Sequence, residues 1–507
     1  MKLLLTTIGD KCPRTDLALR YLYGVIADAP LETTLRTFPD TCPDGEIYDE
    51  IVRGRYNLVY LHCNEKNEYR ITNLAEMIKK AVPSIAVIAG GMQVSFDTGY
   101  FMRKNSWVDY VIRGEGESVF YNFIKTLVSY EFDFENIPGL AYRNAEDIIV
   151  NDYDIPVDMD ELPFPYEKTE LTGKVAYYES IRGSSDRTLY YQSLPDASVR
   201  AASLNKVCTE LRYFLVKGVD KVVFLDRWFN YNTERAYRLF EYIINNDNGK
   251  TAFEFRIDGD NIDEETVRLL SEAREGLFIF DIDVASTNAE TLAAIGRREN
   301  IYQLMYNVTK LLQSCDIEVN INITVGLPTE TEALFARSFN KAYGLAEGSP
   351  VHINTLRLPK GTMLRKESSK YGYLFMNNPP YEVIATDRMP APDLIKIKMI
   401  SNVVENYLGD GGFKSSVPRM LNDTGMKPYD LFSRLTEYIY SNGWEKKLRK
   451  KENLARIMYS FATGMYDEMD DTLKLQILQE VIHEDMETAL NEDLLKKFER
   501  KGWDIEF

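Results

Sequence analysis

The chain has 507 residues, of which 45% are hydrophobic and 27% are charged, the balance of a globular protein with about two to four domains. Its formal net charge of −18 argues against non-specific binding to nucleic acid, and its apolar runs fall far short of the ~20 residues that span a bilayer. The five cysteines are scattered and form no C-x-x-C pair, which argues against a disulfide framework and a standard metal site and favours a cytoplasmic protein.

Strand and helix patterns alternate along residues 1–145, beginning with the apolar strand KLLLTTI. Alternation at this spacing predicts a Rossmann-like parallel sheet, whose ligands sit at the carboxyl ends of the strands. We expect strands at 2–8, 32–38, 56–63 and 84–91, a strand and turn at 108–117, and helices at 15–28, 48–54, 73–83, 100–106 and 118–129.

Glycines follow two of these strands directly. The sequences AGG at 89–91 and RGEGE at 113–117 place Gly90, Gly91, Gly114, Glu115 and Gly116 at strand ends. A glycine there lets a large or anionic ligand approach the backbone. These residues are therefore candidates for cofactor binding, although tight turns alone would explain them equally well.

An acidic, proline-containing stretch at 146–174 has the composition of a linker. Strand and helix patterns then alternate again over 175–365, which predicts a full or partial TIM-type barrel with its chemistry at the carboxyl ends of the strands. Residues 366–507 change to a succession of helical patterns, which predicts a helical C-terminal domain. The expected barrel strands lie at 221–230, 251–260, 276–286, 317–328 and 350–362.

The stretch YYESIRGSSDRTLYYQSL, residues 177–194, has the frame of an iron–sulfur loop. After the Arg-Gly turn, Ser184, Thr188 and Tyr191 keep the x-x-x and x-x spacing that three cluster cysteines would need. No cysteine occupies any of the three positions.

Several long motifs in the same order resemble the radical SAM proteins with an N-terminal B12-binding domain, in the subgroup with a C-terminal domain of unknown function. They are IAGGMQVSFD, VDYVIRGEGE, YYESIRG, FLDRWFN, GLFIFDIDVASTNAETL and VGLPTET. The resemblance covers nearly the whole chain. It implies a cobalamin-binding-type α/β domain at 1–145 and a radical SAM-like barrel at 175–365.

The chain departs from this family in the residues that define its chemistry. Family members hold a [4Fe–4S] cluster with three cysteines, where this chain has hydroxyl side chains that are poor substitutes for thiolates. The resemblance makes Asp226, Asp281 and Ser286 candidates for a vestigial SAM site. We therefore expect that the cluster and SAM binding have been lost.

Cobalamin remains a candidate ligand, although the Asp-x-His-x-x-Gly motif is absent. Cys12, Cys42 and Cys63 each follow one of the first three expected strands, so their thiols could converge on a relocated metal site. The alternative is that they are small buried residues, as free cysteines often are.

Three functions stay open at this stage. The first is a pseudoenzyme with a binding, sensing or scaffold role, whose partners would be cobalamin or a related small molecule and an intact paralogue, with no nucleic acid and no membrane. The second is a barrel enzyme that uses acidic groups at the barrel mouth. The third is a B12-dependent radical SAM methyltransferase-like enzyme with displaced cluster ligands. The residues considered for the second function are Asp226, Arg227, Asp258, Asp260, Asp281 and Asp283.

Overall fold

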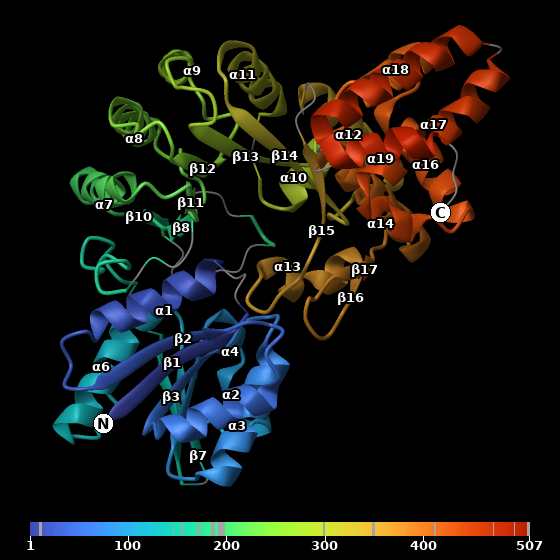
Figure 1. Cartoon of the computed structure of the whole chain (residues 1–507). Coiled ribbons are helices and arrows are strands. Elements are labelled where there is room, and N and C mark those ends of the chain that lie inside the picture. Colours follow the sequence, from blue (N-terminus) through green and yellow to red (C-terminus); the bar gives the residue numbers. More distant parts are fainter. Residues whose placement is uncertain are drawn as a thin grey trace.

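Three regions follow one another along the chain in the computed structural model: an α/β domain, a half-open barrel and a helical domain (Figure 1). The structure describes residues 1–9, 13–145, 147–153, 156–169, 171, 174–183, 188–190, 198–297, 300–346, 350–409, 412–469, 471–490 and 492–503.

The N-terminal domain is built on one seven-stranded sheet with the order β2-β1-β3-β4-β5-β6-β7. The first five strands of this order are parallel to one another. Strand β6 is antiparallel to β5, and β7 is antiparallel to β6. This confirms the expected Rossmann-like sheet. The strands are β1 (Lys2–Ile8), β2 (Glu32–Phe38), β3 (Leu58–His62), β4 (Ala86–Gly90), β5 (Tyr110–Ile112), β6 (Leu140–Asn144) and β7 (Asp147–Val150). The helices are α1 (Pro13–Val25), α2 (Asp44–Gly54), α3 (Glu68–Ala81), α4 (Met92–Ser95), α5 (Thr98–Lys104) and α6 (Gly116–Ser129).

Both faces of this sheet carry a hydrophobic core. Val59 and Leu61 of β3 pack into one apolar cluster, whereas Leu58 and Tyr60 pack into another on the opposite face. All five residues of β3 are buried. Near-continuous apolar strands are what a parallel sheet covered by helices on both sides requires.

Strand β7 extends this domain beyond the expected boundary at residue 145. It pairs with β6 at the edge of the sheet and ends at Val150, within the stretch that we expected to be linker. Its Ile148 and Ile149 are half-buried and pack at the edges of the two apolar clusters, but this run is short and its acidic surroundings predict a linker.

The second region is a parallel six-stranded sheet with the order β15-β14-β13-β12-β11-β8. Among the described residues its two edge strands, β15 and β8, do not pair, so the sheet is a partial barrel. The strands are β8 (Val175–Tyr178), β11 (Lys221–Phe224), β12 (Ala252–Ile257), β13 (Phe278–Ala285), β14 (Glu318–Val325) and β15 (Val351–Thr355). The helices are α7 (Leu204–Lys217), α8 (Thr233–Asn245), α9 (Glu264–Leu270), α10 (Ala289–Ala294), α11 (Ile301–Ser314) and α12 (Glu332–Ala346).

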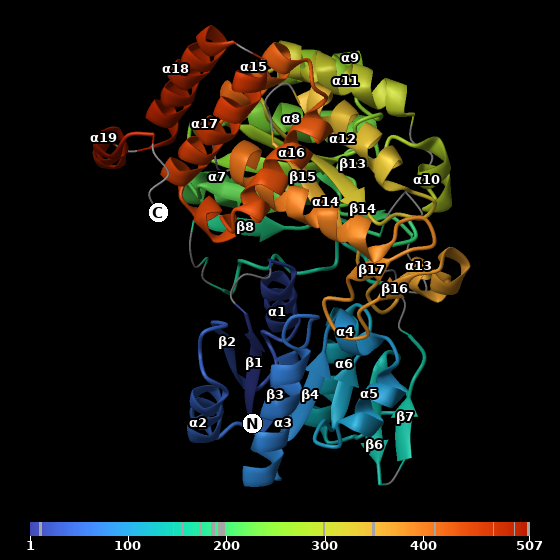
Figure 2. The same cartoon turned by 90° about the vertical axis from the view of Figure 1, so that its right-hand side faces the viewer.

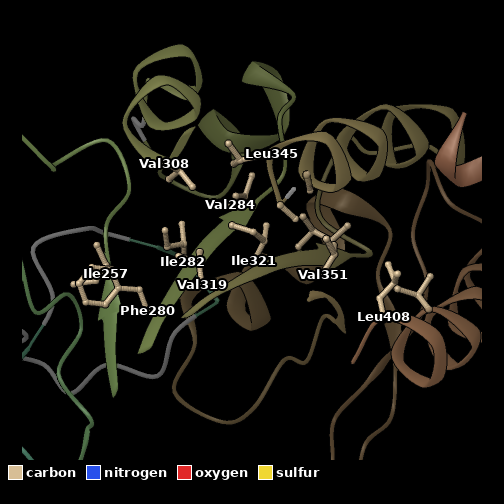
Figure 3. Close-up of a cluster of buried hydrophobic side chains, with 14 of the residues drawn as sticks. Ile257, Phe280, Ile282, Val284, Val308, Val319, Ile321, Leu345, Val351 and Leu408 are labelled. Atoms are coloured by element: carbon tan, nitrogen blue, oxygen red, sulfur yellow. The ribbon is translucent and has the colours of Figure 1, made fainter. Parts of the chain in front are cut away.

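The two faces of this second sheet differ in chemistry. Figure 3 shows the outer face, where Ile282 and Ile321 pack with Val308 of α11 and Leu345 of α12. The inner face is partly exposed and polar. It carries Glu254, Arg256, Asp281, Asp283, Asn320 and Asn322 at alternate positions of β12, β13 and β14.

The third region confirms the expected helical domain, which lies against the barrel near β15 (Figure 2). Before it, α13 (Met363–Lys366), β16 (Leu374–Phe375) and β17 (Val383–Ala385) lie between the barrel and the N-terminal domain in both views. None of the helices in the described parts of the chain is both long and apolar enough to cross a membrane. The helices are α14 (Ala391–Val404), α15 (Ser416–Thr424), α16 (Pro428–Ser441), α17 (Lys451–Glu468), α18 (Thr472–Ala489) and α19 (Glu492–Lys501).

Candidate functional site

A polar cleft of about 820 Å³ opens at the barrel mouth, where the inner face of the sheet meets the loop after β3 of the N-terminal domain. Most of its walls come from the carboxyl ends of β11 to β15 and the segments that follow them. The lining residues are Glu65, Tyr190, Arg227, Trp228, Arg256, Asp281, Asp283, Asn322, Thr324, Ile353, Asn354, Thr355, Leu356, Arg357, Pro359 and Glu382.

Asp283 is fixed within the cleft by a buried arginine. Arg297 Nη1 lies 3.1 Å from Asp283 Oδ2, and Arg297 Nη2 donates a 2.6 Å hydrogen bond to the Asp283 carbonyl. The Arg297 side chain is 1% exposed, and its guanidinium lies 5.6 Å from the centre of the Trp228 ring. This arrangement orients a carboxylate and an aromatic face toward the same space.

Asp281 lies two residues before Asp283 in β13, on the same face of the strand. Burial and the neighbouring Glu254 carboxylate raise its pKa, while Arg256 and a hydrogen bond with Asn322 oppose that rise. A carboxyl group with a raised pKa in a cleft is a candidate for proton transfer or for binding a cation.

The cleft also joins the barrel to the N-terminal domain. Arg357, which follows β15, forms a 3.1 Å ion pair with Glu65 from the loop after β3. Glu382 forms a short ion pair with Lys398. Charges of both signs therefore line the cleft, and three of its four acidic residues have a cationic partner within the protein.

One segment of the predicted cluster loop reaches this cleft. Leu189 N donates to Ile295 O at 2.9 Å and Leu189 O accepts from Leu364 N at 2.8 Å, which holds the segment against the barrel. Tyr190 lines the cleft, and Thr188 is only 6% exposed. Ser184 and Tyr191 lie outside the described residues.

The donor set at these three positions does not suit an iron–sulfur cluster. Serine, threonine and tyrosine present protonated hydroxyl groups at neutral pH, whereas the irons of such a cluster are held by cysteine thiolates. The chain therefore has no thiolate at any of the three positions of the loop.

Asp226 anchors the backbone that leads into this loop. Its carboxyl group accepts hydrogen bonds from Ser180 N at 2.7 Å, Ser180 Oγ at 2.5 Å and Ile181 N at 3.0 Å. Burial raises the pKa of Asp226 to about 7 despite these bonds, and the residue has no exposed surface. Of the three vestigial SAM-site candidates, Asp226 thus faces the protein interior.

Ser286 is also fully buried, and it donates a 2.9 Å hydrogen bond to Glu330 Oε1. The second oxygen of Glu330 has no hydrogen-bond partner among the described residues, and burial raises the pKa of this carboxyl group to about 8. Asp281 is therefore the candidate of the three that lines the cleft. Asp260, from the acidic set, instead accepts a hydrogen bond from Asn300 N at the start of α11.

The glycines at the N-terminal strand ends pack against side chains of their own domain. A methyl group at Gly90 would lie 2.1 Å from Tyr60 Oη, and one at Gly91 would lie 2.9 Å from His62 Nε2. Gly116 is covered in the same way by Ile112 and Leu22. In the direction that a side chain would take, the space at these glycines is therefore already filled by the protein.

Glu115 holds the two α/β regions together. Its carboxylate pairs with Arg200, with Nη1 at 2.9 Å, and with Arg182 Nη1 at 3.4 Å. Burial alone would raise the pKa of Glu115, but the two arginines lower it below its usual range. Arg182 also binds Glu117 at 2.7 Å and Glu179 at 3.0 Å. Gly114 N donates to Ser95 Oγ at 2.9 Å, beside this cluster.

The hypothesis that the cysteines form a relocated metal site has no support in the described part of the chain, where no group of three metal-binding side chains converges. Cys63 is buried, and that burial raises the pKa of its thiol. Cys42 packs at the edge of the same apolar cluster, and Cys12 lies outside the described residues.

Sequence reasoning missed Tyr190, Arg256, Arg297 and the Glu65–Arg357 pair as parts of the site. The alternation of apolar and charged residues in β12 was a usable signal for Arg256, because a strand buried on both faces would be apolar throughout. Arg297 follows α10 and pairs with Asp283 of β13, and Glu65 pairs with Arg357 from 292 residues away, so neither pair leaves a local pattern.

Three family models match successive parts of the chain. They are the B12 binding domain over residues 1–124, the radical SAM superfamily over residues 197–342, and a protein of unknown function, DUF4080, over residues 369–505.

Curated relatives match shorter stretches. The cobalamin-dependent radical SAM methyltransferase TokK of Streptomyces tokunonensis is 32% identical over 108 residues, 21% of this chain and 16% of TokK. The anaerobic magnesium-protoporphyrin IX monomethyl ester cyclase of Synechocystis is 25% identical over 181 residues, 34% of this chain and 35% of the cyclase. The matched part is thus well under half the length of these two relatives.

Two solved structures share the fold. The cobalamin-dependent SAM radical enzyme OxsB with aqua-cobalamin bound superposes with a TM-score of 0.64 and 13% identity, over 99% of this chain and 83% of OxsB. The radical SAM methyltransferase TsrM from Kitasatospora setae, with tryptophan and a SAM analogue bound, gives a TM-score of 0.61 and 16% identity, over 75% of this chain and 80% of TsrM.

Proposed function

We propose that this chain, which belongs to the radical SAM proteins with an N-terminal B12-binding domain, is a binding or sensing pseudoenzyme that holds no [4Fe–4S] cluster and does not cleave SAM. The observation that carries the proposal is the residue set Ser184, Thr188 and Tyr191. The cluster's role in such chemistry is to deliver an electron to SAM, and the cluster needs soft thiolate ligands.

The polar cleft supports a binding role that is independent of the cluster. Its walls carry carboxylates, guanidinium groups, amides and aromatic rings within one space of about 820 Å³, a size in the range of small-molecule sites. Arg297 keeps Asp283 oriented from behind, so this part of the wall is already ordered before a ligand enters. We expect the ligand to be a small polar molecule, and an intact paralogue is the partner that we expect for a scaffold role.

A barrel enzyme is the second candidate, and Asp281 is the observation that favours it. The pKa of Asp281 is raised within the cleft, as in many acid–base residues. Asp226 gives this alternative no support because it is buried and bonded to the backbone. A methyltransferase-like enzyme with a relocated cluster would need the cysteines instead, and the buried Cys63 thiol has a raised pKa that disfavours the thiolate.

The experiment is anaerobic reconstitution of the full-length protein with iron and sulfide, followed by iron and sulfide analysis. We expect near-zero iron per chain and no thiolate-to-iron absorption band. The matched control is the triple variant Ser184→Cys/Thr188→Cys/Tyr191→Cys, which restores the three ligands and should take up about four irons per chain.

Stoichiometric iron in the unchanged protein would overturn the proposal. In that case, loss of the iron on substituting Cys12, Cys42 or Cys63 would identify a relocated cluster. Iron that survives those substitutions would point to ligands outside these cysteines.

A further inference from the structure

We infer that the N-terminal domain of this chain excludes cobalamin, because Tyr60 and His62 occupy the space that its strand-end glycines would otherwise leave open. The inference concerns a different cofactor and a different domain from the proposed loss of the iron–sulfur cluster. Each can therefore fail without the other.

The first step is the geometry of β3 and β4. His62 and Gly90 are register partners on these neighbouring parallel strands, and Tyr60 lies two residues earlier on the same face. Tyr60 is 2% exposed, and its ring meets Phe120 of α6 edge-on, with the ring centres 5.4 Å apart. The tyrosine is thus packed between the sheet and α6, with its hydroxyl directly beneath Gly90.

His62 closes the next position along the strand ends. A side chain at Gly91 would begin 2.5 Å from the Cys63 carbonyl oxygen and 2.9 Å from His62 Nε2, and Gly91 adopts φ +105, a conformation that favours glycine. Burial lowers the pKa of His62 to about 4, so the imidazole is neutral at physiological pH. The neutral imidazole ring of His62 therefore lies beside Gly91 at the end of β4.

A second observation concerns the crevice between β1 and β3, where the strand order of the sheet reverses. Ligands of open parallel sheets bind in such crevices. Here the buried Asn67 side chain spans the crevice, and its Nδ2 donates to Ile8 O at 3.0 Å and to His62 O at 3.1 Å. The ends of β1 and β3 are tied together across the crevice.

A third observation is that the barrel covers the same strand ends. Gly361 packs so closely that a methyl group on it would lie 2.1 Å from the Phe96 ring, and Lys360 lies 3.8 Å from Glu68. Gln93, just after β4, donates a hydrogen bond to Tyr381 Oη. The face that would receive a cofactor is therefore a contact surface between two domains.

Together these contacts make the α/β domain a support for the barrel instead of a cofactor site. Cobalamin carries a broad corrin ring and a nucleotide tail. The cleft beside Glu65 leaves the ends of β3 and β4 filled, so the tail can enter between these strand ends only by displacing Tyr60, His62 or the 357–381 segment. Tyr60 and His62 are the two obstacles that side-chain substitution can remove.

The test incubates the purified full-length protein with hydroxocobalamin, removes free cobalamin by gel filtration, and measures bound cobalamin by its absorbance after conversion to the dicyano form. We expect no bound cobalamin in the unchanged protein or in Tyr60→Phe, which keeps the ring. The double variant Tyr60→Gly/His62→Ser should retain cobalamin stoichiometrically. Circular dichroism confirms folding, and Tyr60→Ser/His62→Ser serves if the glycine variant does not fold.

Two outcomes would overturn the inference. One is stoichiometric cobalamin in the unchanged protein. Nitrogen superhyperfine splitting in the electron paramagnetic resonance spectrum of the reduced cob(II)alamin, lost in His62→Ser, would then make His62 a cobalt ligand. The other is a folded double variant that retains no cobalamin, since exclusion would not depend on these two side chains.

Discussion

The two parallel sheets of this protein place their polar residues differently. In β3 of the N-terminal domain every side chain is buried, and both faces meet a hydrophobic cluster. In β12, and in β13 and β14 before their carboxyl ends, only alternate residues are buried, and the others form a polar and charged inner face. A parallel sheet is therefore packed on both faces in the N-terminal domain, whereas in the barrel one of its faces stays partly exposed.

This difference teaches where ligand binding can reside. A sheet with two apolar faces and covered strand ends gives rigidity and a docking surface. A sheet with one polar face gives a lined cleft, and Asp281, Asp283 and Arg256 stand in it at adjacent strands. The difference supports the proposals that binding resides in the barrel cleft and that the N-terminal domain serves as its support.

The largest expected effect comes from the contact that joins the two regions. Arg182→Ala removes the partner of Glu115, Glu117 and Glu179 from a site where the arginine is 11% exposed. The variant leaves Glu117 and Glu179 without this cation and leaves Glu115 with Arg200 alone, which should cost about 3–5 kcal/mol in the free energy of unfolding. Urea unfolding measures it.

The control for this variant is Arg238→Ala, which breaks an exposed pair with Glu241 and should cost less than about 1 kcal/mol. Equal losses in the two variants would show that the Arg182 contacts do not couple the domains.

Next in size is a test of the two sheet faces by neighbouring substitutions. Ile321→Ala on the outer face of β14 should cost about 2–5 kcal/mol, whereas Asn320→Ala on the inner face should stay within about 0.5 kcal/mol. In β3, Leu61→Ala and Tyr60→Ala should each cost more than about 2 kcal/mol, because both faces are packed. The same unfolding measurement applies, and a costly Asn320→Ala would contradict an open inner face.

A further prediction distinguishes the regions by pH. The pKa of Glu330 in the barrel is about 8 in the folded protein, against an ordinary value of 4.5, so the folded state holds a proton that the unfolded state releases. Its stabilising contribution is complete below pH 4.5 and is lost as the pH rises to 8, with a total of about 5 kcal/mol. Glu330→Gln should flatten this fall between pH 5 and 8. Parallel profiles for the two proteins would refute the assignment.

The smallest effect runs in the opposite direction. His62 in the N-terminal domain has a pKa of about 4, against an ordinary value of 6.5. Between these two pH values the unfolded state therefore binds a proton at His62 and the folded state does not. Stability is lost as the pH falls from 6.5 to 4, by about 1–3 kcal/mol. His62→Ser should reduce that loss in urea unfolding at pH 4.5 and 6.5. If the variant is as acid-sensitive as the original, His62 does not carry this dependence.

Periodicity and strand spacing predicted both sheets and the helical domain, because local patterns determine which face of each element is buried. The strand-end positions of Gly90 and Glu115 were also predictable. What fills those positions was not, since Tyr60 reaches Gly90 across the sheet and Arg200 reaches Glu115 from a separate domain.

The cleft was predictable only in part. Asp281 and Asp283 follow from alternation along one strand, as the sequence indicates. Asp226 occupies a similar strand-end position, yet it turns inward to bind the backbone at Ser180 and Ile181. A strand-end acid can serve either purpose, and only the neighbouring loop decides which.

The contacts of Glu115 with two arginines also bear on the loop between β9 and β10. Arg182 and Arg200 stand in the paired strands β9 (Ile181–Arg182) and β10 (Arg200–Ala201), at the two ends of the loop that contains positions 184, 188 and 191. One carboxylate therefore contacts an arginine at each end of that loop, and both arginines stand outside the three positions. The proposed loss of the cluster would leave these two contacts unchanged, so the ends of the loop would stay joined without it.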